Sequence, residues 1–178
     1  MIPLTAHQYC PVSTLILSRD IYTIIRRVNK QSSRRKMMSA LGLPIFDKAI
    51  QDANIWVNEV MDELDWDDKQ RAYNLLRSTL HVLRDRLAPD EAAHLAAQLP
   101  TIIRGMYYEG YKPSRPPSKI RHKDEFVAAV QKVHGNQPDD DPDRAVTAAL
   151  NIIADHVSQG EMDDVRATLP KELRNLWD

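Results

Sequence analysis

A short stretch past the middle of the chain alternates aromatic and cationic side chains, a composition suited to recognition. Its candidate contact residues are Tyr108, Tyr111, Lys112, Arg115, Lys119 and Arg121. Aromatic rings can stack on nucleic-acid bases while cations neutralise phosphates. The same residue types, tyrosine and arginine above all, are enriched at protein–protein interfaces. Two kinds of partner are therefore open: a nucleic acid, or a protein, which includes a second copy of this chain.

Metal ligands are few and poorly spaced. His81 and Asp85 lie one helical turn apart and His94 follows in the next segment, but a zinc site needs three or four ligands in fixed geometry. Aspartates cluster at 65–68 and 139–141, each time directly before a long apolar pattern. There they are expected to cap helices. We predict no metal and no cofactor.

The charged cluster Arg84-Asp85-Arg86 admits two interpretations. Arg77, Arg84 and Asp85 could bind an anion. Cations in the last turn of a helix, however, also interact favourably with its negative end. We expect a structural role, with Asp85 in an ion pair between helices.

Signals of catalysis are absent from the sequence. Ser78 and Thr79 have no neighbouring base, Cys10 lies in the N-terminal stretch, and there is no nucleophile elbow, phosphate loop or dinucleotide fingerprint. We predict that the chain is not an enzyme. An active site assembled from residues far apart in sequence is the alternative.

The apolar residues recur at helical spacing. From Phe46 to Leu64 they fall in steps of three and four, which predicts one amphipathic helix, and the spacing from Ala72 to Leu87 predicts a second. Leu-Pro at 99–100 and 169–170 ends two short helices, because proline lacks an amide donor. With no pattern typical of a strand, the fold class is all-α, a helical bundle of about eight helices.

Residues 68–107 and 141–177 carry one pattern twice. An acidic start, Arg-Ala, an apolar helix, Glu, Leu-Pro, Arg and an aromatic follow in the same order, so that Arg104 corresponds to Arg174 and Tyr107 to Trp177. The second copy is three residues shorter in its first helix. Repeats of this kind usually pack against each other. We predict two related halves, with Tyr107 in the core.

These patterns divide the chain into an extension and one domain. We predict an N-terminal extension over residues 1–37 and a single all-α domain over 38–178, with halves at 46–110 and 124–178. Residues 111–123 form a basic, Pro-rich connector between the halves. The stretch 110–123 has three prolines, five Lys/Arg and no acid, so we expect it to be exposed and extended.

Charge is unevenly distributed. Residues 1–36 hold seven Lys/Arg and one acid, a net +6, while the remainder holds 17 Lys/Arg and 24 acids, a net −7. The basic extension, poorly structured or helical, is a nucleic-acid or membrane arm, a transit peptide, or the result of a misplaced start. We favour a true start at Met37 or Met38. A single cysteine and no apolar run of about 18 residues predict a cytoplasmic protein without a membrane span.

The strings WDDKQRAYNLLRS and LHVLRDRLAPDEAAHLAAQLPTIIRGMYYEG, with the RPP that follows, resemble the bacterial family of domain of unknown function 2267. The resemblance covers about residues 38–178. It implies a helical fold in a bacterial protein. It implies no established activity, cofactor or catalytic residue.

Together these observations favour a non-catalytic protein-interaction module, an adaptor or a homo-oligomer. The first alternative is a nucleic-acid-binding protein that uses the aromatic and basic connector, although the acidic remainder of the chain would repel a nucleic acid. The second is an enzyme whose site is not visible in the sequence.

Overall fold

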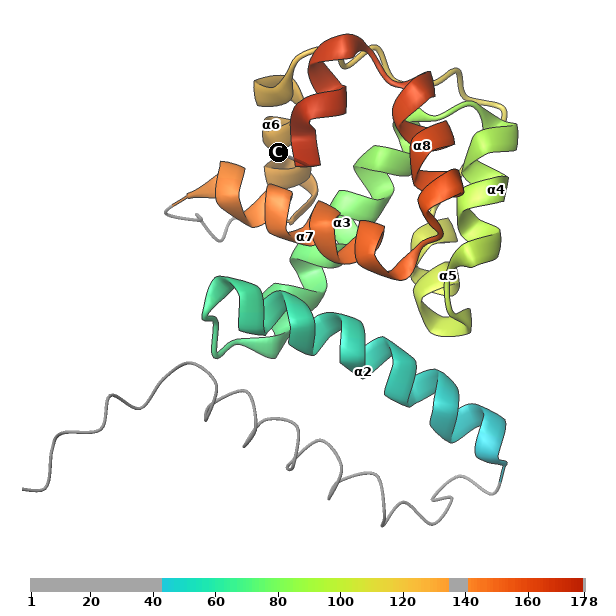
Figure 1. The fold of residues 1–178 in the computed structure, drawn as a ribbon, viewed down its shortest axis with the longest axis vertical. Coiled ribbons are helices and arrows are strands. Elements are labelled where there is room, and N and C mark those ends of the chain that lie inside the picture. Colours follow the sequence, from blue (N-terminus) through green and yellow to red (C-terminus); the bar gives the residue numbers. More distant parts are fainter. Residues whose placement is uncertain (1–42, 135–140, 178) are drawn as a thin grey trace, which may run out of the picture. The chain divides into compact units, whose positions relative to one another are not determined.

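The computed structural model describes residues 43–134 and 141–177, and every regular element within these ranges is helical (Figure 1). The elements are α2 (Pro44–Leu64), α3 (Lys69–Arg86), α4 (Pro89–Gln98), α5 (Thr101–Tyr108), α6 (Lys123–His134), α7 (Pro142–His156), α8 (Gln159–Thr168) and the 3-10 helix η1 (Lys171–Trp177). The all-α prediction is confirmed. The predicted boundary at residues 37 and 38 lies outside the described residues.

Helix α3 is the centre of the bundle. It packs against α2, α5, α6 and α7, and seven consecutive residues, 78–84, are buried. A helix buried around its whole circumference is normally apolar all round. This one also buries Ser78, Thr79, His81 and Arg84. These polar groups need partners inside the protein, because an unpaired buried polar group costs free energy.

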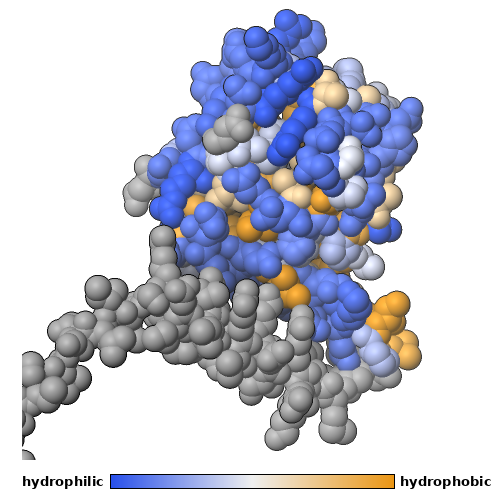
Figure 2. All heavy atoms as spheres, in the orientation of Figure 1, coloured by the Kyte–Doolittle hydropathy of each residue, from blue (hydrophilic) through white to orange (hydrophobic). Residues whose placement is uncertain are grey.

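Helix α2 extends past the core that it covers. Trp56, Val57 and Val60 are buried, whereas Phe46 on the same predicted stripe is 53% exposed. Figure 2 shows apolar side chains at the start of α2 as a patch on a mostly hydrophilic face. The helix ends at Asp65, whose φ of 54° is a left-handed conformation that aspartate tolerates better than most residues. None of the described helices is both long and apolar enough to cross a membrane.

The two halves follow one plan. Helices α3, α4 and α5 correspond in order to α7, α8 and η1, and α3 packs on α7 as α4 packs on α8. Asp68 and Asp141 cap the long helices: Asp68 accepts from the amides of Gln70 and Arg71, and Asp141 accepts from that of Arg144. Helix α3 has 18 residues and α7 has 15, which is the predicted difference of three.

Each half closes on an arginine and a buried aromatic residue. Arg104 donates to the carbonyls of Ala97 and Leu99, as Arg174 does to those of Ala167 and Leu169. The Tyr107 hydroxyl donates to the carbonyl of Ala92 at 2.9 Å, and the Trp177 indole donates to that of Leu150 at 3.1 Å. The prediction that Tyr107 belongs to the core is confirmed, since its side chain is fully buried.

Two details distinguish the second half. Its last element, η1, is a 3-10 helix, in which the amide of Leu173 donates to the Pro170 carbonyl at 2.9 Å. Short helical elements often take this tighter winding. Ser158 and Glu161 have the spacing of a reciprocal capping box. Ser158 accepts from the Glu161 amide, but Oε1 of Glu161 is buried without a hydrogen-bond partner among the described residues.

The missing half of this capping box has a physical reason in the packing of α8 on α4. Burial raises the pKa of the Glu161 carboxyl, which also lies in the fields of His94 and Glu91 on α4. The side chain therefore occupies the contact between the two short helices instead of folding back to its own N-cap.

The Tyr107 hydrogen bond gives a first prediction. Tyr107→Phe removes one buried hydrogen bond and leaves the ring in place, so the free energy of unfolding should fall by about 1 kcal/mol. Tyr107→Ala also opens a cavity and should cost about 3–5 kcal/mol. Urea unfolding followed by circular dichroism measures both. Tyr73→Phe, on the exposed side of α3, is the matched control, and equal stability losses for the two Phe variants would contradict the assignment.

Candidate functional site

The six predicted contact residues lie at and beyond the end of α5, and we call them the connector surface: Tyr108, Tyr111, Lys112, Arg115, Lys119 and Arg121. Tyr108 is 37% exposed, Tyr111 is half-buried, and all four cations are exposed. The segment that carries them runs between α5 and α6 (Figure 1). The structure thus brings the six residues onto one continuous stretch of exposed chain.

The connector is tied to the C-terminal end of α3. The amide of Ser118 donates to the Asp85 carbonyl at 2.7 Å, and Nε of Arg86 donates to the Ile120 carbonyl at 2.8 Å. A turn also forms where the amide of Arg115 donates to the Lys112 carbonyl at 3.0 Å. The predicted exposure is correct, but the segment is anchored at both its middle and its end.

Arg84 fixes the point at which the connector begins. Its side chain is buried and donates from Nη1 to the carbonyls of Tyr107 and Glu109, the latter at 3.1 Å. The last carbonyls of a helix have no partner within it, and Arg84 supplies one. Its guanidinium lies 5.0 Å from the centre of the Tyr111 ring, within the range of a cation–π interaction.

Two more residues of α3 hold the end of α5. The Nε2 atom of His81 is 2.7 Å from the Met106 carbonyl, and burial lowers the pKa of the imidazole, although this carbonyl acts in the opposite direction. Nε of Arg77 lies 2.6 Å from the Glu109 carboxylate, and this hydrogen bond lowers the pKa of the carboxyl. The end of α5 is thus bound by three side chains of one helix.

The prediction that Asp85 forms an ion pair with another helix is wrong. Asp85 pairs with Arg84, its neighbour on the same helix, at 2.8 Å, and the pair that joins two elements is Arg77 with Glu109. Arg84 turns inward to the carbonyls of α5, which leaves its Nε beside Asp85. The sequence contains one signal for the real arrangement, because residues 77, 81 and 84 share a helix face by their spacing of four and three.

The other chemistry candidates occupy separate places. His81 faces Met106, Asp85 faces Arg84, and Nδ1 of the exposed His94 lies 3.9 Å from Glu91, so the imagined metal ligands are not brought together. The Ser78 hydroxyl donates to the Asn74 carbonyl, and Thr79 is fully buried. Cys10 and Asp139 lie outside the described residues.

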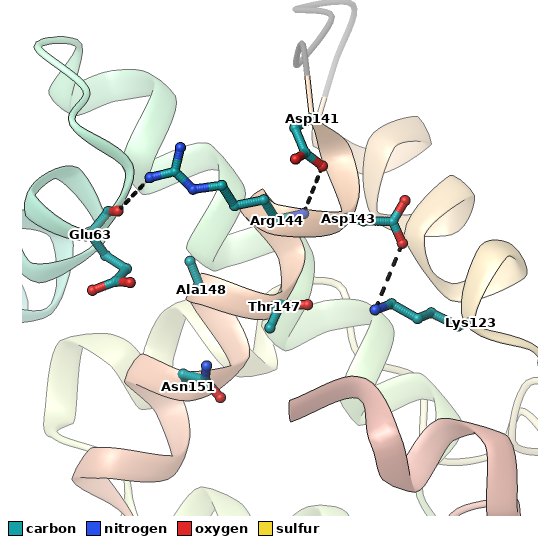
Figure 3. A pocket seen from close by; sticks show the side chains of 8 residues that line it. All are labelled: Glu63, Lys123, Asp141, Asp143, Arg144, Thr147, Ala148 and Asn151. Carbon is teal, nitrogen blue, oxygen red and sulfur yellow. Dashed lines mark hydrogen bonds and ion pairs between the residues drawn. The ribbon is translucent and has the colours of Figure 1, made fainter. Parts of the chain in front are cut away.

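A shallow pocket of about 310 Å³ opens at the start of α7, a feature that sequence reasoning missed. Figure 3 shows charged side chains of both signs around it. Nζ of Lys123 lies 3.9 Å from Asp143, and Nη2 of Arg144 donates to the Glu63 carbonyl at 3.1 Å. Its cations are therefore already engaged by neighbouring groups, which makes the pocket a weaker candidate than the connector surface.

Comparison with known proteins identifies relatives by sequence. Residues 53–176 match the family described as "Uncharacterized conserved protein (DUF2267)". The match includes both halves and the whole connector surface. It confirms the resemblance, although it begins at residue 53 and not near residue 38. A comparison with curated proteins found no match.

The buried guanidinium of Arg84 yields a stability prediction. Arg84→Gln removes the donor that serves two carbonyls at the end of α5, so the free energy of unfolding should fall by about 3 kcal/mol. Denaturant unfolding measures the loss. The matched control is Arg115→Gln, which removes an exposed charge and should change stability by less than about 0.5 kcal/mol. A loss for Arg84→Gln as small as that of the control would contradict the capping role.

His81 yields a prediction of pH dependence. Burial lowers its pKa in the folded protein below the ordinary value of 6.5, so the unfolded chain binds a proton that the folded protein resists. The stability that His81 contributes is present above this value and is lost as the pH falls below it. Urea unfolding between about pH 5 and 7.5 should show His81→Gln losing less stability on acidification than the wild type.

His122 provides the control of opposite sign. Its Nδ1 atom lies 2.6 Å from Glu172, and this hydrogen bond raises the pKa of the imidazole. The contribution of His122 is therefore present below 6.5 and is lost as the pH rises. His122→Gln should steepen the acid loss. A shift of the same sign in both variants would show that the histidine assignments are incorrect.

Proposed function

Since the chain belongs to the DUF2267 family, whose description names no activity, we propose from the structure itself that it is a non-catalytic protein-interaction module, an adaptor that contacts its partner through the connector surface. The observation that carries the proposal is a set of exposed cations on an anchored backbone. Lys119 and Arg121 flank Ile120, whose carbonyl is bonded to Arg86.

An anchored surface favours binding because less freedom is lost on association. Ordering a flexible loop at an interface costs free energy for each immobilised segment and side chain. Here the Ser118 amide and the Ile120 carbonyl are already bonded to α3 before any partner arrives. Tyr108 adds an exposed ring at the start of the surface, and tyrosine supplies large contact area at low entropic cost.

The surroundings favour a protein over a nucleic acid. Carboxylates of Asp85 and Glu109 flank the connector with side chains 54% and 56% exposed. Of its two tyrosines, Tyr111 is half-buried against Arg84, which leaves Tyr108 as the exposed ring for stacking. A nucleic-acid strand prefers a continuous positive groove with several stacking platforms, whereas a protein surface can match charges of both signs.

The non-catalytic part of the proposal rests on how the reactive side chains are used. His81, Arg84 and Arg77 are committed to the end of α5 by the bonds described above. Groups engaged in structural bonds are poorly placed to transfer protons or to stabilise charge that develops on a substrate. We also propose a cytoplasmic location, on the basis of the single cysteine in the sequence.

Site-specific photo-crosslinking tests the proposed function. A photoreactive amino acid at position 119 should yield a discrete crosslinked protein in the cells that naturally make this chain. The same residue at position 93, an exposed alanine of α4, is the matched control and should yield none. The crosslinked species should disappear when Arg115 and Arg121 are both changed to glutamate, because like charges then oppose the partner.

Two outcomes contradict the proposal. Equal crosslinking from positions 119 and 93 would show that the connector is not a specific surface. Crosslinking from position 119 to nucleic acid and not to protein would establish the alternative function.

A further inference from the structure

We propose that Arg86 and Arg121 together form a carboxylate-binding site, so that the partner presents an acidic segment with neighbouring Asp or Glu side chains. This inference rests on the proposed function and specifies the chemistry of the partner. Arg86 belongs to the last turn of α3 and was not among the predicted contact residues.

The geometry places the Arg86 guanidinium beside the backbone of Arg121. Nε of Arg86 donates to the carbonyl of Ile120 at 2.8 Å, and Ile120 immediately precedes Arg121. The Ser118 amide donates to the Asp85 carbonyl at 2.7 Å, and this bond fixes the connector three residues before Arg121. Arg86 is half-buried, and the hydrogen bond that its side chain makes to the described residues uses Nε and not the terminal nitrogens.

The site combines the positive charges of Arg86 and Arg121, and the Glu125 carboxylate nearby offsets only part of them. Burial lowers the pKa of the Arg86 guanidinium, and the nearby charge of Arg121 lowers it further. Within residues 43–134 and 141–177, neither arginine forms an ion pair with an acid. A bound carboxylate would supply the missing charge and accept two parallel hydrogen bonds from a guanidinium.

The acidic side chains around the site favour a short acidic segment over a long polyanion as the partner. The Glu125 carboxylate accepts from the amides of Arg121 and His122, and Glu172 pairs with His122 at 2.6 Å. Asp85 precedes Arg86 in α3, and its carboxylate is paired with Arg84. A nucleic-acid backbone with a charge at every nucleotide would meet these acids on leaving the site, while a few carboxylates of a peptide would not.

The test uses the full chain and an oligo-glutamate peptide as the probe. A carbodiimide joins carboxylates to lysine amines without a spacer, and Lys119 lies two residues from Arg121. Mass spectrometry of the products reports which lysines received the peptide. We expect attachment at Lys119 in the wild type, and a drop of about tenfold in Arg86→Gln/Arg121→Gln, as for the loss of one good charged contact.

Controls within the same protein separate this site from general attraction of anions. Attachment at Lys30 and Lys36 in the basic N-terminal stretch should be unchanged by the two arginine substitutions. Lys48→Gln/Lys132→Gln removes the same number of charges at exposed positions on α2 and α6 and should leave attachment at Lys119 within about twofold of the wild type. Arg121→Gln alone, an exposed substitution, should lower the attachment without disturbing the fold.

The outcomes separate this inference from the proposed function. If attachment at Lys119 is insensitive to both arginines while photo-crosslinking from position 119 still captures a protein, the carboxylate site is refuted and the interaction module stands. An oligothymidylate of equal charge serves as a competitor. If it lowers the attachment of the peptide to Lys119 more than an equal amount of extra unlabelled oligo-glutamate does, the site prefers phosphate and both proposals fail.

Discussion

One buried guanidinium holds the first half of this protein together. Arg84 is 3% exposed, and its hydrogen bonds go to the carbonyls of Tyr107 and Glu109 and to the carboxylate of Asp85. A buried charge is tolerated only where hydrogen bonds replace its lost hydration. Because the end of α5 supplies two of these acceptors, α5 cannot move away from α3 without stranding the cation. The position of Tyr111 and the first residues of the connector follow from that constraint.

The connector surface is held in place by α3. The same helix binds the end of α5 through His81 and Arg77, and it binds the connector again through the Asp85 carbonyl and the Arg86 side chain. A central helix that packs against four others has little freedom to shift, so the segment bonded to it is more constrained than a Pro-rich linker is expected to be. Cations on such a support present a fixed pattern of charge to a partner.

The sequence predicted the elements and the repeat well, because both rest on local signals. Helical spacing, Leu-Pro breaks and aspartate caps each act within a few residues, and the correspondence of Arg104 with Arg174 reappears as matching bonds to helix-terminal carbonyls. The tertiary partners were harder to predict. Whether Arg84 turns outward to Asp85 alone or inward to α5 depends on where α5 docks, and Glu109 became a partner of Arg77 only through that docking. Arg86 stood out in the sequence only as part of a charged helix end, since its bond to Ile120 requires the connector to fold back over the end of α3.

The repeat does not duplicate Arg84. When Asp155 is aligned with Asp85, Ala154 takes the place of Arg84. Among the described residues, no guanidinium corresponding to Arg84 donates to the last carbonyls of η1, the counterpart of α5. The scaffold is double, but the connector surface exists once among the described residues. A partner bound as proposed would therefore engage one such surface per chain. To bridge two partners, the chain would need a second surface of different chemistry. The start of α2 is exposed and apolar, with Ile45 70% accessible, and it differs in this way from the charged connector surface.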